Sequence, residues 1–171
     1  MIKYLLDTNI VIYVLKRRPI EVLEIFNKNT NRMAISSITL SELIYGAEKS
    51  PNVDKNLEVI EDFISHLEVL PYDAKASQHY GQIKSLLEKK GEIIGENDIH
   101  IAAHAISQGL ILVTNNLKEF KRVPNLALEN WVWNEWGKYI ELPSHVNKKW
   151  WLHLSLSNIS VYSGSYYLWC Q

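Results

Sequence analysis

Acidic side chains stand at the ends of predicted elements in this 171-residue sequence. Asp7 directly follows the apolar run YLL, Glu42 lies in the first turn of a predicted helix, and Asp98 opens a later helix. Asn116, after the apolar run LILVT, is a fourth candidate. Clustered carboxylates repel one another unless protons or cations neutralise them, and hard oxygen ligands favour Mg²⁺ or Mn²⁺ over zinc. If they converge, these residues predict a site for a divalent metal ion.

Each candidate also has a simpler explanation. Glu42 lies three residues after Thr39 and completes a capping-box pattern. Asp98 is favoured at a helix start by the helix dipole, and Asn116 lies in the sequence TNN, which suits a turn. Asp7 is harder to explain in this way, because a carboxylate delivered by a buried strand is costly unless it is paired, hydrogen-bonded or bound to a cation.

Strands and helices are predicted to alternate along the chain. Alternation of this kind indicates an α/β fold with a mostly parallel sheet covered on both faces. Such sheets bind ligands beyond the carboxyl ends of their strands, which is where Asp7 lies. The predicted strands are residues 2–6, 33–36, 67–72 and 110–114, and the helices beyond the first are 20–27, 39–50, 53–66, 73–90 and 97–108. Asp73 is predicted to begin its helix, and Gly91 to cap the end of the same helix.

Composition excludes several classes of function. With 18 basic and 19 acidic residues the net charge is -1, so no global field favours nucleic acid or an anionic membrane, and any RNA contact must come from a local patch. The only cysteine, Cys170, excludes a disulfide framework within the chain and a cysteine-type zinc site. A reducing, cytoplasmic setting fits this composition. We expect no membrane contact, because no apolar stretch approaches the length of about 20 residues that a membrane helix needs.

Other patterns for catalytic chemistry are weaker. His100 and His104 lie four residues apart, but the sequence HIAAH lacks the glutamate of the zinc-protease motif, so we interpret both as structural or surface residues. The sequence has no glycine-rich phosphate loop, and no nucleophile-elbow motif surrounds Ser36, Ser37 or Ser41.

Three segments together resemble a known family. YLLDTNIVIYVLKRRP, AISSITLSELIYGAEKS and IGENDIHIAAHAISQGLILVTNNLKEFKRVPNLALENW are similar to the PIN-domain ribonucleases, and specifically to the VapC toxins of bacterial VapBC toxin–antitoxin pairs. The resemblance runs from residue 1 to about 131 and is greatest to the subgroup that cleaves initiator tRNA in its anticodon region. It implies a three-layer α/β/α sandwich. The first three acids of the family fall on Asp7, Glu42 and Asp98, and the fourth acidic position falls on Asn116.

The resemblance implies metal-assisted hydrolysis of a phosphodiester bond. Asp7 and Asp98 would hold one Mg²⁺, with Mn²⁺ as a substitute, and Glu42 would bind it directly or through water. Asn116 offers a neutral carbonyl in place of a carboxylate, so a second ion should bind weakly. Thr8 and Asn9 are expected to orient Asp7, and Thr114 to position water. Two basic groups are candidates for holding RNA phosphates, Lys16–Arg18 and Lys118, Lys121 and Arg122.

The family also implies protein partners. A VapB-type antitoxin would lay a helix along an apolar groove of the toxin and insert a basic side chain among the carboxylates. The toxin is expected to form a homodimer, with the apolar faces of the early helices as candidate interfaces, and to join the antitoxin in a hetero-oligomer.

The end of the chain has a different composition. All six tryptophans lie between Trp131 and Trp169, so we expect a nuclease domain over residues 1–132 and a Trp-rich extension over 133–171. The extension is either an appendage, from read-through or fusion, or an aromatic surface for a partner. If it disables catalysis, the chain would be an antitoxin-binding protein only. A haloacid-dehalogenase-like phosphatase is a weaker alternative, because it needs a second Asp where this chain has Asn9, and a receiver-like module lacks its expected acids and lysine.

Overall fold

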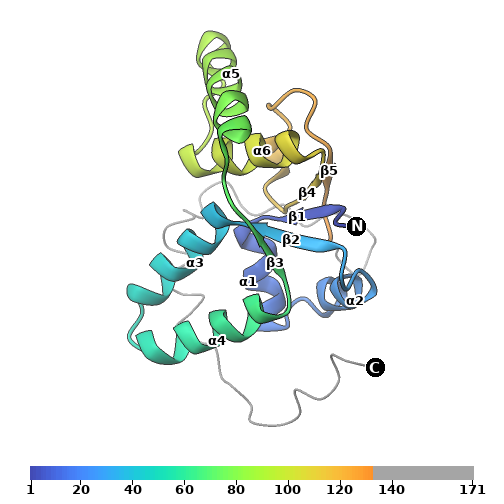
Figure 1. The fold of residues 1–171 in the computed structure, drawn as a ribbon, viewed down its shortest axis with the longest axis vertical. Coiled ribbons are helices and arrows are strands. Elements are labelled where there is room, and N and C mark those ends of the chain that lie inside the picture. Colours follow the sequence, from blue (N-terminus) through green and yellow to red (C-terminus); the bar gives the residue numbers. More distant parts are fainter. Residues whose placement is uncertain (133–171) are drawn as a thin grey trace.

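The computed structural model describes residues 1–132, which form five strands and seven helices (Figure 1). The strands are β1 (Tyr4–Leu6), β2 (Met33–Ser36), β3 (Glu68–Leu70), β4 (Ile111–Val113) and β5 (Leu128–Glu129). The helices are α1 (Thr8–Lys16), α2 (Ile20–Lys28), α3 (Ser37–Glu48), α4 (Val53–Ser65), α5 (Ala74–Lys90), α6 (Glu96–Gln108) and α7 (Leu117–Phe120). The Trp-rich extension predicted over 133–171 lies outside the described residues.

The five strands form one parallel sheet in the order β3-β2-β1-β4-β5. The chain builds outward from β1 through β2 to β3, then returns to the other side of β1 with β4. Strand order therefore reverses between β1 and β4, where Leu6 pairs with Val113. Open α/β sheets bind ligands beyond the carboxyl ends of their strands at such a switch point. Asp7 follows β1 there.

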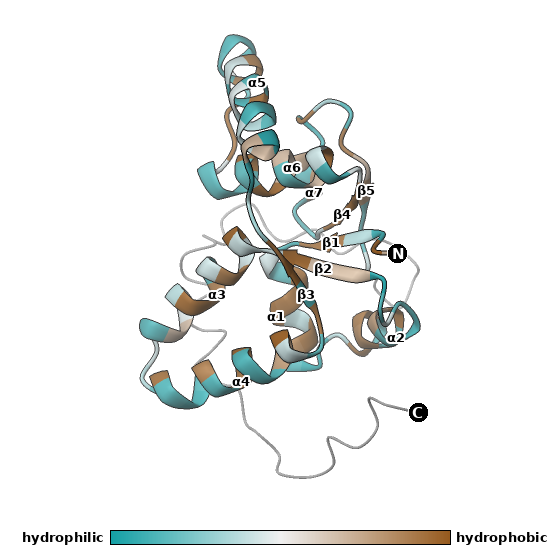
Figure 2. Ribbon diagram, in the orientation of Figure 1, coloured by the Kyte–Doolittle hydropathy of each residue, from teal (hydrophilic) through white to brown (hydrophobic). Residues whose placement is uncertain are grey.

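Helices cover both faces of the sheet, which confirms the predicted three-layer α/β/α sandwich (Figure 1). Alternation along β1 decides which core each side chain joins. Tyr4 and Leu6 pack with α1, α2, α3 and α4, whereas Leu5 packs with α5, α6 and α7. Figure 2 shows hydrophobic residues along the strands and hydrophilic ones on the outer helix faces.

Helix ends follow capping chemistry, with one correction to the sequence-based prediction. Asp73 accepts a bond from the backbone N–H of Ala76 and Gly91 ends α5 in the left-handed conformation, as predicted. The predicted cap at Thr39 is wrong. Ser36 caps α3 instead, accepting from the N–H of Ile38, so the helix begins directly after β2. Glu42 then lies in the second turn of α3 and cannot complete a capping box.

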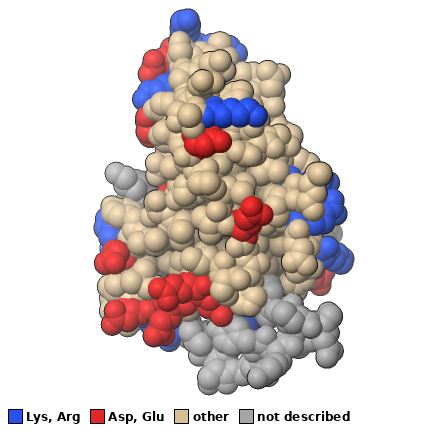
Figure 3. Space-filling view, in the orientation of Figure 1, with Lys and Arg blue, Asp and Glu red and all other residues tan. Residues whose placement is uncertain are grey.

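Charge is distributed unevenly over the face drawn in Figure 3. Acidic side chains gather along α4, whose exposed acids are Asp54, Glu58, Glu61 and Asp62. Both signs of charge occur around α5. In the described part of the chain, no helix is both long and apolar enough to cross a bilayer.

Candidate active site

Asp7 is held in place by three hydrogen bonds at the carboxyl end of β1. It is only 2% exposed and caps α1, accepting from the backbone N–H of Thr8 at 2.8 Å. Its Oδ2 accepts from Asn9 Nδ2 at 2.8 Å and from the Thr114 hydroxyl at 2.7 Å. The carboxylate therefore has one fixed orientation, because donors from α1 and from the end of β4 converge on it.

Glu42 lies close to this position although it comes from another helix. Its Oε2 accepts a hydrogen bond from the hydroxyl of Thr8, the residue next to Asp7. Its Oε1 accepts from Asn97 Nδ2 at 2.9 Å, in the first turn of α6. Glu42 thus joins α3 to α1 and α6 at the same edge of the sheet.

Asp98 and Asn116 form the other side of the site. Asp98 is 4% exposed in the first turn of α6, and its Oδ2 accepts from Asn116 Nδ2 at 3.2 Å. The backbone N–H of Asn116 donates to the Thr114 hydroxyl at 2.9 Å, and that hydroxyl donates in turn to Asp7. A continuous hydrogen-bond path thus connects Asp98 to Asp7.

Glu119 belongs to the same locality and was not predicted from the sequence. Its Oε2 accepts from the Gly95 backbone N–H at 3.3 Å. A Cβ added at Gly95 would lie 3.3 Å from Asp98 Oδ2 and 3.8 Å from Glu119 Oε2. The two carboxylates therefore border one small space that the glycine leaves open. The available signal was an acid three residues after Asn116, which starts α7, but this spacing also matches an ordinary capping box.

The side-chain oxygens at this site determine which metal ion it could bind. Among residues 1–132, no three His, Cys, Asp or Glu side chains form a ready-made metal site. In this arrangement the acids are connected through Thr8, Asn97 and Asn116 rather than grouped directly. The donor set still fits a hard divalent cation, because it offers carboxylate oxygens and two of the acids, Asp7 and Asp98, are buried.

A buried hydrogen-bond network around Asn115 lies next to the site. The backbone N–H of Asn115 donates to Asn9 Oδ1 at 3.3 Å, and Asn115 Nδ2 donates to the Tyr13 hydroxyl at 3.2 Å. Asn130 Nδ2 donates to Asn115 Oδ1 at 3.0 Å. Burial raises the pKa of Tyr13, although the bond from Asn115 opposes this, so the hydroxyl stays protonated. This network fixes Asn9, which in turn orients Asp7.

The structure shows what each residue predicted to assist Asp7 contacts. Asn9 does orient its carboxylate, whereas the Thr8 side chain bonds Glu42 and only the Thr8 backbone contacts Asp7. Thr114 contacts Asp7 directly. Among the basic residues, Arg122 donates to the Ile93 carbonyl at 3.1 Å. Their role in holding RNA stays a prediction.

The two histidines have different surroundings. His104 is fully buried, with Nδ1 2.8 Å from the Ser36 hydroxyl, and its Nε2 has no hydrogen-bond partner among residues 1–132. Burial lowers the pKa of His104, although Asp73 acts in the opposite direction. His100 is half-buried and lies with its Nδ1 3.0 Å from the Tyr72 hydroxyl. His104 therefore belongs to the core, and His100 to the surface between α5 and α6.

Comparison with known proteins places this chain in a family. Residues 4–126 match the PIN domain. Ribonuclease VapC2 of Haemophilus influenzae is 62% identical over 132 residues, which are 77% of this chain and all of that protein. The tRNA(fMet)-specific endonuclease VapC of Salmonella typhimurium is 55% identical over 131 residues, covering 77% of this chain and 99% of its own length.

Solved structures agree with the sequence relatives. The crystal structure of DNA-bound VapBC from Salmonella typhimurium superposes with a TM-score of 0.74 at 55% identity, covering 77% of this chain and 99% of the matched one. VapBC-1 from nontypeable Haemophilus influenzae gives a TM-score of 0.70 at 39% identity, covering 77% and 98%. The resemblance inferred from the three sequence segments is confirmed. The chain belongs to the PIN-domain family, within its VapC ribonucleases.

Proposed function

We propose that this chain is a Mg²⁺-dependent endoribonuclease toxin that cleaves tRNA, with the anticodon region of initiator tRNA as its target. The observation that carries the proposal is the set of acids at the β1/β4 switch point, where Asp7 and Asp98 are buried and connected through Thr114 and Asn116. The tRNA target is supported by the 55% identity to the Salmonella protein named as a tRNA(fMet)-specific endonuclease.

Asp7, Asp98 and Glu42 are the residues that would hold the ion. When bound, Mg²⁺ or Mn²⁺ lowers the pKa of a water molecule and stabilises charge on the phosphate. The chain's own contribution is orientation. Asn9 and Thr114 fix Asp7, and Thr8 and Asn97 fix Glu42.

Glu119 would supply the acid that Asn116 lacks. The family position that falls on Asn116 carries a neutral amide here, and this amide donates to Asp98. Glu119 Oε2 borders the same space as Asp98 Oδ2 beside Gly95. We therefore assign a second ion to Asp98 and Glu119, with Asn116 orienting Asp98.

Partners and domain organisation extend the proposal. A VapB-type antitoxin is the expected partner, supported by the structural match to VapBC complexes. Residues 1–132 would be the nuclease unit, because relatives matched over nearly their whole length cover only 77% of this chain. We further propose a homodimer acting in the cytoplasm. Co-expression with a VapB antitoxin and measurement of the mass of the purified complex would test the assembly.

The activity is tested by incubating the full chain with purified tRNA and Mg²⁺ and sequencing the RNA ends. We expect one cut in the anticodon loop, lost in Asp7→Asn and in Asp98→Asn. Asp62→Asn, an exposed acid on α4, is the matched control and should cleave normally. Equal cleavage by all four proteins would reject this site. No cleavage by the wild type together with antitoxin binding would favour a binding protein without catalysis.

A further inference from the structure

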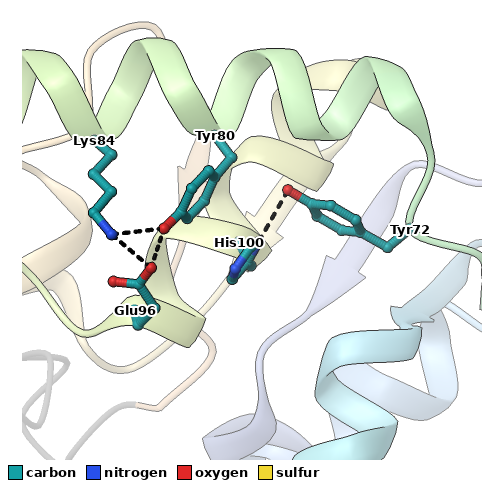
Figure 4. Close-up of polar contacts among 5 residues, drawn as sticks. All are labelled: Tyr72, Tyr80, Lys84, Glu96 and His100. Carbon is teal, nitrogen blue, oxygen red and sulfur yellow. Dashed lines mark hydrogen bonds and ion pairs between the residues drawn. The ribbon is translucent and has the colours of Figure 1, made fainter.

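Three aromatic rings form a half-buried cluster between α5 and α6. This α5–α6 aromatic cluster consists of Tyr72, Tyr80 and His100 (Figure 4). The rings of Tyr80 and His100 are stacked, with centroids 4.1 Å apart and an interplanar angle of 10°. Tyr72 meets His100 edge-on, with centroids 5.1 Å apart. These rings are not part of a helix cap or of the acid site.

Polar contacts hold the stacked rings in one conformation. The Tyr80 hydroxyl donates to Glu96 and accepts from Lys84 Nζ at 2.9 Å, while Lys84 and Glu96 form an ion pair at 2.8 Å (Figure 4). The bond to Glu96 raises the pKa of Lys84, so the lysine stays charged. Because the Tyr80 ring is already held in one conformation, it loses little conformational entropy when a further planar group joins the stack.

The cluster is continuous with the acid site. At about 100° per residue, Asn97 projects about 100° from Asp98 around α6, and His100 projects only about 60° from Asn97. Asn97 bonds Glu42, so it lies between the carboxylates and the rings. Tyr72 lies near the same edge of the sheet, because its backbone N–H donates to the Ser37 hydroxyl at the start of α3. A polymer lying over Glu42 and Asn97 would next reach His100.

His100 also retains a polar atom for a ligand. Its Nδ1 is paired with the Tyr72 hydroxyl at 3.0 Å. Within residues 1–132, its Nε2 makes no hydrogen bond. A fixed aromatic stack with one available ring nitrogen suits a nucleobase, which has a planar face for stacking and polar atoms at its edge.

We propose that the α5–α6 aromatic cluster binds an unpaired nucleobase of the RNA, next to the phosphate that lies at the acid site. This inference rests on the proposed ribonuclease function. The base extends the Tyr80–His100 stack, and His100 Nε2 bonds its edge. The exposed acids of α4 make that helix unfavourable for RNA, whereas both signs of charge occur around α5.

The test measures binding of an anticodon stem-loop RNA to the full chain carrying Asp7→Asn, which prevents cleavage during the measurement. We expect His100→Leu and Tyr80→Ala each to weaken binding about tenfold, since stacking on an aromatic ring contributes on this scale. His66→Leu, on an exposed histidine after α4, is the matched control and should bind normally. Tyr80→Phe should weaken binding less than Tyr80→Ala, because it keeps the ring and loses only the contacts of the hydroxyl.

The Tyr80→Phe variant separates RNA contact from a structural role. If the cluster only clamps α6 through Glu96, Tyr80→Phe should weaken binding as much as Tyr80→Ala, and that result would overturn the inference. As a second measurement on the Asp7→Asn chain, the ¹⁵N NMR signals of the His100 ring should shift on adding the stem-loop. Unshifted signals in the presence of bound RNA would also overturn it.

Wild-type cleavage of tRNA distinguishes the two failures. Normal cleavage with no effect of the cluster variants on RNA binding would remove this inference and leave the proposed function intact. Absence of both cleavage and RNA binding would remove both.

Discussion

Two acids on α6, Asp98 and Glu96, show how environment separates a candidate ligand from a residue that stabilises the surface. Asp98 is 4% exposed and accepts a bond from the neutral amide of Asn116. Glu96, two residues earlier, has a side chain that is 56% exposed and pairs with Lys84. Exposed ion pairs contribute little stability, whereas a buried carboxylate is costly unless hydrogen bonds or a cation compensate for its burial. The same helix turn thus carries a candidate ligand and a surface clamp.

We expect the largest effect from replacing a buried acid of the site. Asp7→Asn should reduce tRNA cleavage at least about a hundredfold, because a neutral amide cannot replace the charge that holds a divalent ion. Glu96→Gln, on the exposed side, should change the rate by less than about threefold, since its ion pair lies in solvent. Initial rates at saturating Mg²⁺ measure both. A Glu96→Gln defect as large as that of Asp7→Asn would contradict the distinction.

Thr114→Val tests the hydrogen bonds that orient the buried acids. The Thr114 hydroxyl donates to Asp7 and accepts from the Asn116 backbone. The hydroxyl also accepts from Asn9 Nδ2 at 3.2 Å. Valine preserves the shape but removes all three bonds, so we expect about a tenfold loss of cleavage with the fold intact. Thr30→Val, whose hydroxyl bonds a local carbonyl in an exposed turn, is the control. An unchanged rate in Thr114→Val would show that this hydroxyl does not position the site.

Gly95→Ala tests whether the space between Asp98 and Glu119 is used, because it places a methyl group there. The added Cβ would lie 3.3 Å from Asp98 Oδ2, closer than ordinary van der Waals contact. We expect cleavage to fall by about threefold to tenfold as Asp98 shifts. Gly81→Ala in α5 meets nothing within 4 Å and should raise the free energy of unfolding by about 0.5–1 kcal/mol without affecting cleavage. Normal cleavage by Gly95→Ala would mean that the space is not used.

The smallest effect concerns the pH dependence of stability through His104. Its folded-state pKa is lowered by burial, so the unfolded chain binds the proton more readily. The stability that comes from keeping this ring neutral is therefore present above the unfolded value of about 6.5 and is lost as the pH falls through the folded pKa. Urea unfolding at about pH 8 and about pH 5 should show a larger loss for the wild type than for His104→Gln. Equal losses would contradict this assignment.

Local chemistry made much of the fold predictable from the sequence. The apolar run before Asp7 predicted β1, and Asp73 and Gly91 marked both ends of α5. The start of α3 was predicted wrongly at Thr39, because Ser36, three residues earlier, is also a good capping residue. The structure selects Ser36 because the chain passes from β2 into the helix without a loop.

Contacts between distant segments were less predictable. Glu119 lies in a four-residue helix, too short to give a periodic pattern, and it reaches Gly95 only through the packing of α6 and α7. The Tyr80–His100 stack joins residues from two helices, and nothing in either local sequence specifies it. That Asp7, Glu42 and Asp98 form one metal site stays a prediction, and the hydroxyl and amide groups that connect these acids could be found only from the structure.

Calorimetric titration of Mn²⁺ into the full chain would show whether the buried acids bind a divalent ion, because it detects ion binding without relying on activity. We predict saturable binding in the wild type that is lost in Asp7→Asn and Asp98→Asn and retained in Asp62→Asn. Identical binding by all four proteins would contradict the assignment of these buried acids to a metal site.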